Sequence, residues 1–134
     1  MTCSRGVPLA WRLSAANEHD GPHLLPLLRR YPTVRGRRGR PRAKPWAVLA
    51  DKAYRSAMRE AELRSRRVEP PLPRRGVRDA LRLGRWRWVV ERTVAWLRGF
   101  RRLRTRYERR ADIHLSLLSL ACVLICHRKL PKVV

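Results

Sequence analysis

The strongest periodic pattern in the chain covers residues 85–106. With successive residues turned by about 100°, one group of side chains falls within a stripe roughly 120° wide. The stripe is made of Trp86, Val89, Thr93, Trp96, Leu97, Phe100 and Leu103. We therefore expect an amphipathic helix that buries this stripe against a core.

Three other segments have the apolar patterns of strands. Residues 6–14 alternate loosely, residues 46–50 (WAVLA) form a short continuous apolar run, and residues 67–76 begin as a short strand before a proline-rich stretch. Between the first two, residues 32–45 contain three prolines, two glycines and a run of bases, which predicts an exposed basic loop.

Helical patterns fill the remaining segments. Residues 23–31 resemble a short amphipathic helix, and residues 54–66 a second one, with Ser56 as its cap. The apolar stretch 113–126 predicts a buried helix that Asp112 caps and Pro131 ends. Strands that alternate with helices indicate an α/β sheet with helical cover. We expect one domain over residues 1–134, with 85–130 as its helical C-terminal part.

The net charge of the chain adds a further expectation, namely a polyanionic partner. The formal net charge is +23 at pH 7, and only four of the 33 basic residues are lysine. Such a charge repels itself in a compact fold, so nucleic acid is the expected partner. Arginine suits phosphate contacts, although a G+C-rich gene would produce the same bias. Three cysteines without a CxxC motif indicate a reducing cytosol, and we expect a cytoplasmic protein without a membrane span.

One acid, Glu91, lies within the basic helix pattern and opposite the apolar stripe. Arg87 and Arg98 fall within about 40° of it on the same face. One interpretation is a solvated face with a salt bridge between Arg87 and Glu91. The other is a metal-binding carboxylate between two arginines that hold a DNA backbone. Helical geometry alone leaves both open.

Asp51 is the second notable acid because it follows WAVLA directly. The carboxyl end of a buried strand is a common place for functional groups in α/β sheets. An ordinary strand-to-helix turn explains the same residue equally well.

Four segments together resemble bacterial insertion-sequence transposases, most closely the group named after insertion sequence five, within the insertion-sequence-four-like superfamily. They are GVPLAWRLSAANEHD (6–20), VLADKAYRS (48–56), RVEPPLPRRG (67–76) and the stretch from GRWRWVVERT to LICHRKL (84–130). The resemblance implies a ribonuclease-H-like fold in which two aspartates and one glutamate hold two divalent ions, Mg²⁺ or Mn²⁺. Asp51 resembles the second aspartate and Glu91 the glutamate. Arg87 and Arg98 match basic positions of the signature around that glutamate, while Gly84 stands where the family usually has tyrosine.

The resemblance also implies DNA as substrate, with strand cleavage and strand transfer in the intact enzyme. We expect DNA contacts from Arg87 and Arg98 and from further bases near them and in the loop, namely Arg37, Arg38, Arg40, Lys52, Arg101 and Arg102. The family's first aspartate lies upstream of the segment that residues 6–11 resemble. We therefore expect an N-terminally truncated catalytic domain that is inactive alone, has an upstream half of the transposase as a partner, and forms a homo-oligomer when intact.

Two alternatives remain open. The chain could be a non-catalytic DNA- or RNA-binding protein whose acids form only structural ion pairs, or a remnant without function. For two further motifs, a structural role is favoured over a functional one. RGRPR (38–42) contains an AT-hook core, and Cys122 and Cys126 are four residues apart on the last helix. For Trp88, base stacking and core packing stay equally open.

Overall fold

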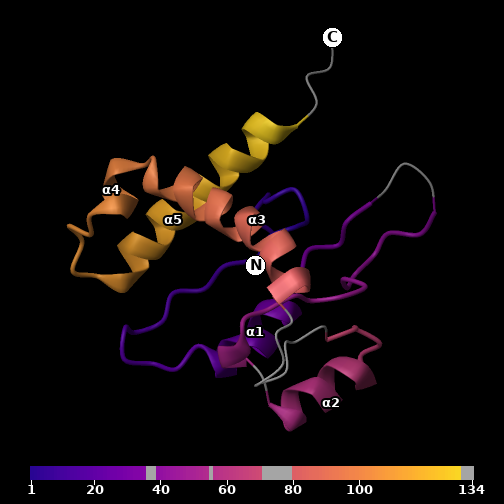
Figure 1. Cartoon of the computed structure of the whole chain (residues 1–134). Helices are drawn as coiled ribbons and strands as arrows, with labels where there is room; N and C mark the ends of the chain where they lie inside the picture. Colours follow the sequence, from indigo (N-terminus) through magenta and orange to yellow (C-terminus); the bar gives the residue numbers. More distant parts are fainter. Residues whose placement is uncertain (36–38, 55, 71–79, 131–134) are drawn as a thin grey trace. The chain divides into compact units, whose positions relative to one another are not determined.

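The structure is a computed structural model that describes residues 1–35, 39–54, 56–70 and 80–130, with the side chains of Lys52 and residues 80–86 left out. The chain divides into two compact units, and each is described by itself. The first unit joins Met1–Leu13 to Arg85–Val134, and the second is Ser14–Gly84. Figure 1 traces the helices along the chain.

The first unit is helical. It contains α3 (Ala80–Arg98), which belongs to it from Arg85 on, α4 (Arg101–Arg104) and α5 (Ala111–Lys129). Its described buried residues come from both segments of the unit, and they include Gly6, Pro8, Ala10, Val89, Thr93, Ala121, Cys122 and Ile125. Apolar side chains from one face of each long helix therefore supply this core.

The predicted helix over 85–106 is confirmed in its first part and interrupted after Arg98. Gly99 donates its N–H to the carbonyls of both Ala95 and Trp96, and Phe100 then adopts an extended backbone conformation. Glycine favours the helix less than every residue except proline, so this is where the continuous pattern ends. Residues 101–104 resume as the separate helix α4.

The helix predicted at the C-terminal end forms as α5, with two differences. Its N-cap is Arg110 instead of Asp112, and Asp112 accepts two hydrogen bonds from the Arg110 guanidinium. The expectation of a buried helix is wrong, because only one face is covered, at Ala121, Cys122 and Ile125. By length and composition, with a mean hydropathy of 1.4, α5 could cross a membrane, although the same holds for many core helices of soluble proteins.

The described part of the second unit contains four short helices besides the first residues of α3. They are η1 (Gly21–His23), α1 (Leu24–Arg29), η2 (Lys52–Tyr54) and α2 (Ala57–Ser65). The two helices predicted from 23–31 and 54–66 are thus confirmed. Pro26 fits because it lies in the first turn of α1, where its missing N–H would have no partner within the helix. Ser56 is the N-cap of α2 by its extended backbone, although its side chain makes no cap hydrogen bond.

The predicted strands form no continuous ladder among the described residues, so the α/β class is not confirmed. Pairing there consists of three isolated bridges, Thr2 with Pro8, Val34 with Arg42, and Ala47 with Glu69. The third bridge is parallel and joins two of the predicted strands. Val48 donates its N–H to the Glu69 carbonyl, and Glu69 donates to Trp46. WAVLA is buried only at Val48, because Trp46 remains 77% exposed and Leu49 40% exposed.

Candidate functional site

Glu91 lies on the exposed face of α3 and is paired with Arg87, one helical turn before it. Arg87 Nε donates to Glu91 Oε1 at 2.8 Å, and the two side chains are 79% and 62% exposed. The predicted salt bridge is therefore present. An exposed pair of this kind stabilises a protein by about 1 kcal/mol at most. Its main effect is to orient the carboxylate.

The same face of α3 has an open hollow that contains both Glu91 and Arg98. Val90, Val94, Ala95 and Gly99 complete its lining. Ala95 contributes only a methyl group and Gly99 no side chain to this lining. A carboxylate and a guanidinium thus lie in one hollow that a phosphate group could enter.

The opposite face of α3 anchors the helix in the first unit. Val89 and Thr93 are each 4% exposed, as the stripe predicts. The Thr93 hydroxyl lies 2.6 Å from the Gly6 carbonyl oxygen and donates to it. This packing fixes which side of α3 carries Glu91.

Beside these two faces, α3 carries a stack of cations and tryptophans that the sequence analysis did not identify. The Arg92 guanidinium lies 4.4 Å from the ring centre of Trp88 and 5.1 Å from that of Trp96. Lys129 Nζ lies 4.4 Å from the Trp96 ring centre. The spacing Trp-x3-Arg-x3-Trp is the sequence signal for this stack, because residues four apart are neighbours on a helix. Trp88 remains 48% exposed.

Asp51 lies in the second unit, immediately before η2, and is exposed. Tyr54 donates its N–H to the Asp51 carbonyl at 3.0 Å. The pKa of Tyr54 is raised by burial first and then by the negative charges of Asp20 and Asp51. The negative charges of Asp20 and Asp51 therefore both act on this tyrosine, which the sequence alone did not indicate.

The predicted metal ligands, Asp51 and Glu91, carry carboxylates that suit Mg²⁺ or Mn²⁺, but the structure does not place them together at one site. Carboxylate oxygens are the donors that Mg²⁺ and Mn²⁺ prefer. Glu91 belongs to the first unit and Asp51 to the second, so each is placed only within its own unit. Among the residues that the structure describes, no three His, Cys, Asp or Glu side chains form a group suited to a metal.

The predicted DNA-binding residues are described unevenly. Arg37 and Arg38 lie outside the described residues, and the side chain of Lys52 is not described. Among the others, Arg40 and Arg101 are exposed, whereas Arg102 is bound to an acid that the sequence analysis passed over.

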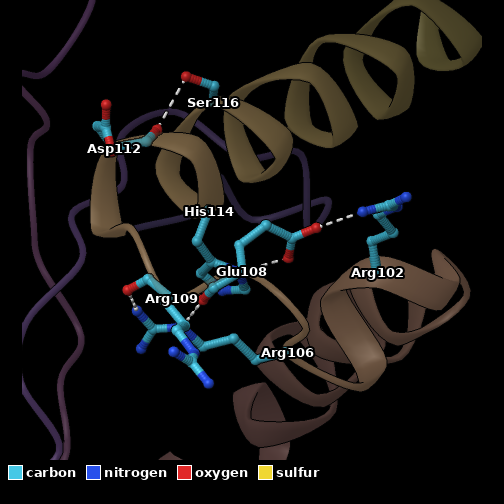
Figure 2. A network of polar contacts seen from close by, with 7 residues as sticks. All are labelled: Arg102, Arg106, Glu108, Arg109, Asp112, His114 and Ser116. Atoms are coloured by element: carbon cyan, nitrogen blue, oxygen red, sulfur yellow. Dashed lines mark hydrogen bonds and ion pairs between the residues drawn. The ribbon is translucent and has the colours of Figure 1, made fainter.

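That acid is Glu108, in the turn between α4 and α5. Arg102 Nη1 donates to Glu108 Oε1 at 2.6 Å, and the Glu108 side chain is only 8% exposed (Figure 2). A sequence signal exists, since Glu108 is the single acid among the six arginines of residues 101–110.

Cys122 and Cys126 behave as residues of a core, in keeping with the structural interpretation. Burial raises the pKa of the Cys122 thiol to about 11 and also raises the pKa of Cys126. Both thiols are therefore protonated near neutral pH, and the thiolate is the form that binds metals.

Comparison with known proteins identifies the family. The transposase DDE domain model matches residues 1–126. A protein from Burkholderia cepacia, named as a transposase for insertion sequence element IS402, is 48% identical over 132 residues. This alignment covers 98% of the chain and 63% of the relative, so the chain spans less than two thirds of that protein's length. No solved structure matches the chain.

The family has a ribonuclease-H-like fold, generally uses divalent metal ions and acts on DNA. The narrower assignment to the insertion-sequence-five group stays a prediction. The match over residues 1–126 and the identity to an insertion-sequence protein together show that this chain belongs to the transposase DDE domain family.

Proposed function

We propose that the chain contributes Asp51 and Glu91 as metal ligands to a transposase that cleaves DNA strands and joins them to new sites. The observation that carries this proposal is the face of α3, where Glu91 is held by Arg87 and shares a hollow with Arg98 in a chain of the DDE family. An acid at this position lowers the positive charge of a phosphate-binding face, which a bound cation would offset.

When bound, two divalent ions would activate the attacking oxygen and stabilise the leaving one. The chain's own residues hold and orient the DNA. Arg87 and Arg98 bind phosphate oxygens beside Glu91, and their positive charge offsets the charge that develops during the reaction. Mg²⁺ or Mn²⁺ and a cytoplasmic location follow from the same proposal.

The partners would be the DNA ends of the element and the target DNA. The name of the relative from Burkholderia cepacia mentions an insertion sequence, which supports this class of substrate. The chain spans 63% of that relative, so a further polypeptide segment belongs to the proposal for the complete enzyme. We also propose that the complete enzyme acts as an assembly of several copies.

The test is excision of the element that encodes this chain from a donor plasmid, in its natural sequence context. Glu91→Gln removes the charge and keeps the shape of the side chain. We expect excision to fall by more than about 100-fold, beyond the 10–100-fold typical of residues that only support a metal ligand.

Glu62→Gln is the matched control, since Glu62 also forms an i,i+4 pair, with Arg66 at 2.6 Å on α2. Its excision should stay within about threefold of the unchanged element, because exposed pairs contribute little. Excision that survives Glu91→Gln, or an unchanged element that never excises, would contradict the proposal. Equal DNA retention by both variants would locate the defect in the reaction rather than in binding.

A further inference from the structure

Glu108 is nearly buried, although it is the one acid in an arginine-rich segment. Its side chain is 8% exposed, and its Oε1 accepts a hydrogen bond of 2.6 Å from Arg102 Nη1. Burying a charge is costly unless the charge is paired. A surface that served only to attract DNA would keep no buried acid, so the carboxylate needs a different explanation.

The contacts of Glu108 hold together the end of α4, the following turn and the start of α5. Arg106 Nε donates to the Glu108 carbonyl at 2.9 Å, and Arg106 Nη2 donates to the Arg109 carbonyl at 3.2 Å. On α5, His114 Nδ1 lies 3.9 Å from the second carboxylate oxygen of Glu108. Figure 2 shows Arg102 of α4 and His114 of α5 reaching the Glu108 carboxylate from the two helices.

The arrangement leaves arginine charge at the surface. Arg102 is 65% exposed, and the bond to Glu108 engages one of the five N–H donors of its guanidinium. Arg101, Arg104 and Arg109 are exposed as well. A fixed guanidinium loses less conformational entropy on binding phosphate than a free one does.

We propose that Glu108 is a positioning residue for DNA binding: its carboxylate fixes Arg102 and the turn at residues 105–110, so that the arginines of residues 101–110 form one phosphate-binding surface. The ligand is the phosphate backbone of duplex DNA, independent of sequence. This inference rests on the proposed function, which makes DNA the partner.

The inference predicts a direction opposite to that expected from net charge. Glu108→Gln removes a negative charge from a very basic chain, which by long-range attraction alone would tighten DNA binding. If Glu108 positions Arg102, the same variant weakens binding. We expect the Kd for a short duplex oligonucleotide to rise about three- to tenfold. The slope of log Kd against log salt should decrease by the amount that corresponds to the loss of about one phosphate contact.

Glu62→Gln is the matched control, because Glu62 also accepts a hydrogen bond from an arginine, Arg66, but both residues lie outside the 101–110 surface. It should bind DNA as tightly as the unchanged chain or more tightly, with the same salt slope. The double variant Arg102→Gln with Glu108→Gln should bind the duplex no more weakly than Arg102→Gln alone, because Glu108 acts through Arg102.

Thermal melts of each variant show whether it is folded. If Glu108→Gln fails to fold, the single variant Arg102→Gln tests the inference. An unchanged slope of log Kd against log salt in Arg102→Gln overturns it. Unchanged or tighter binding by folded Glu108→Gln overturns it too. If the unchanged chain shows no salt-dependent DNA binding, the proposed function itself is contradicted. This measurement comes first, before any variant is compared.

Discussion

Thr93 shows how a single polar residue can belong to an apolar stripe. It is 4% exposed, and its hydroxyl donates to the Gly6 carbonyl at 2.6 Å. Gly6 has a φ of 79°, and an added Cβ would lie 3.1 Å from the Thr93 hydroxyl oxygen. The pattern of residues 85–106 places Thr93 on the buried face, but the partner comes from a segment 87 positions away and leaves no periodic signal.

Thr93→Val keeps the shape of the side chain and removes its donor. We expect the free energy of unfolding to fall by about 1–3 kcal/mol, because the Gly6 carbonyl loses its hydrogen bond inside the first unit. Urea unfolding followed by tryptophan fluorescence measures this change. Thr105→Val at an exposed position should change it by less than about 0.5 kcal/mol. Equal effects of the two variants would show that the Thr93 hydroxyl contributes nothing.

At the scale of elements, the helices were predictable and the strands were not. Helical periodicity is local, so α1, α2, α3 and α5 follow from their own residues. The predicted strand at 46–50 depends on its neighbours for burial, and among the described residues it has one partner, at Glu69. Its sequence therefore shows that it is apolar without showing what covers it.

The candidate site follows the same division. Arg87, Glu91 and Arg98 lie on one helix, so their spacing was enough to predict that they share a face, and the pair at 2.8 Å confirms part of it. A set that combines Asp51 with Glu91 requires contacts across 40 positions, which no spacing encodes. The place of Asp51 directly after WAVLA marked it as a candidate, but its role as a metal ligand came from the family resemblance and stays a prediction.

The junction of α4 and α5 makes the stability of the first unit depend on pH. The hydrogen bond from Arg102 is the main cause that lowers the pKa of Glu108 below its usual value. A carboxyl whose pKa is lower in the folded state stabilises the fold above its unfolded pKa of about 4.3, and this contribution is lost as the pH falls through the folded value.

Melting temperatures of the unchanged chain and Glu108→Gln between neutral pH and pH 3 test this dependence. We expect the unchanged chain to melt higher at pH 7 and the difference to shrink below about pH 4.5. Glu62→Gln, in a pair that is partly exposed on both sides, should lower the melting temperature less at pH 7. A difference that persists undiminished at pH 3 would mean that the Glu108 carboxylate charge does not stabilise the junction.

At the scale of the whole molecule, the net charge gives salt opposite effects on folding and on DNA binding. A charge of +23 on 134 residues repels itself in the folded state. Salt screens this repulsion over a Debye length of about 10 Å at 0.1 M. The same salt weakens binding to DNA, because the free energy gained from each counterion released falls as the bulk salt concentration rises.

We therefore expect the melting temperature of the chain to rise by several degrees between about 0.05 and 0.5 M NaCl, while its affinity for duplex DNA falls by orders of magnitude over the same range. Calorimetry and fluorescence anisotropy on one preparation measure the two effects, and an uncharged osmolyte at equal concentration controls for changes in water activity. A melting temperature that falls with salt would mean that the ion pairs of Glu91, Glu108 and Asp112 outweigh the repulsion among the arginines. In that case the few acids of the chain, rather than screening by a bound polyanion, would be what keeps so basic a protein folded.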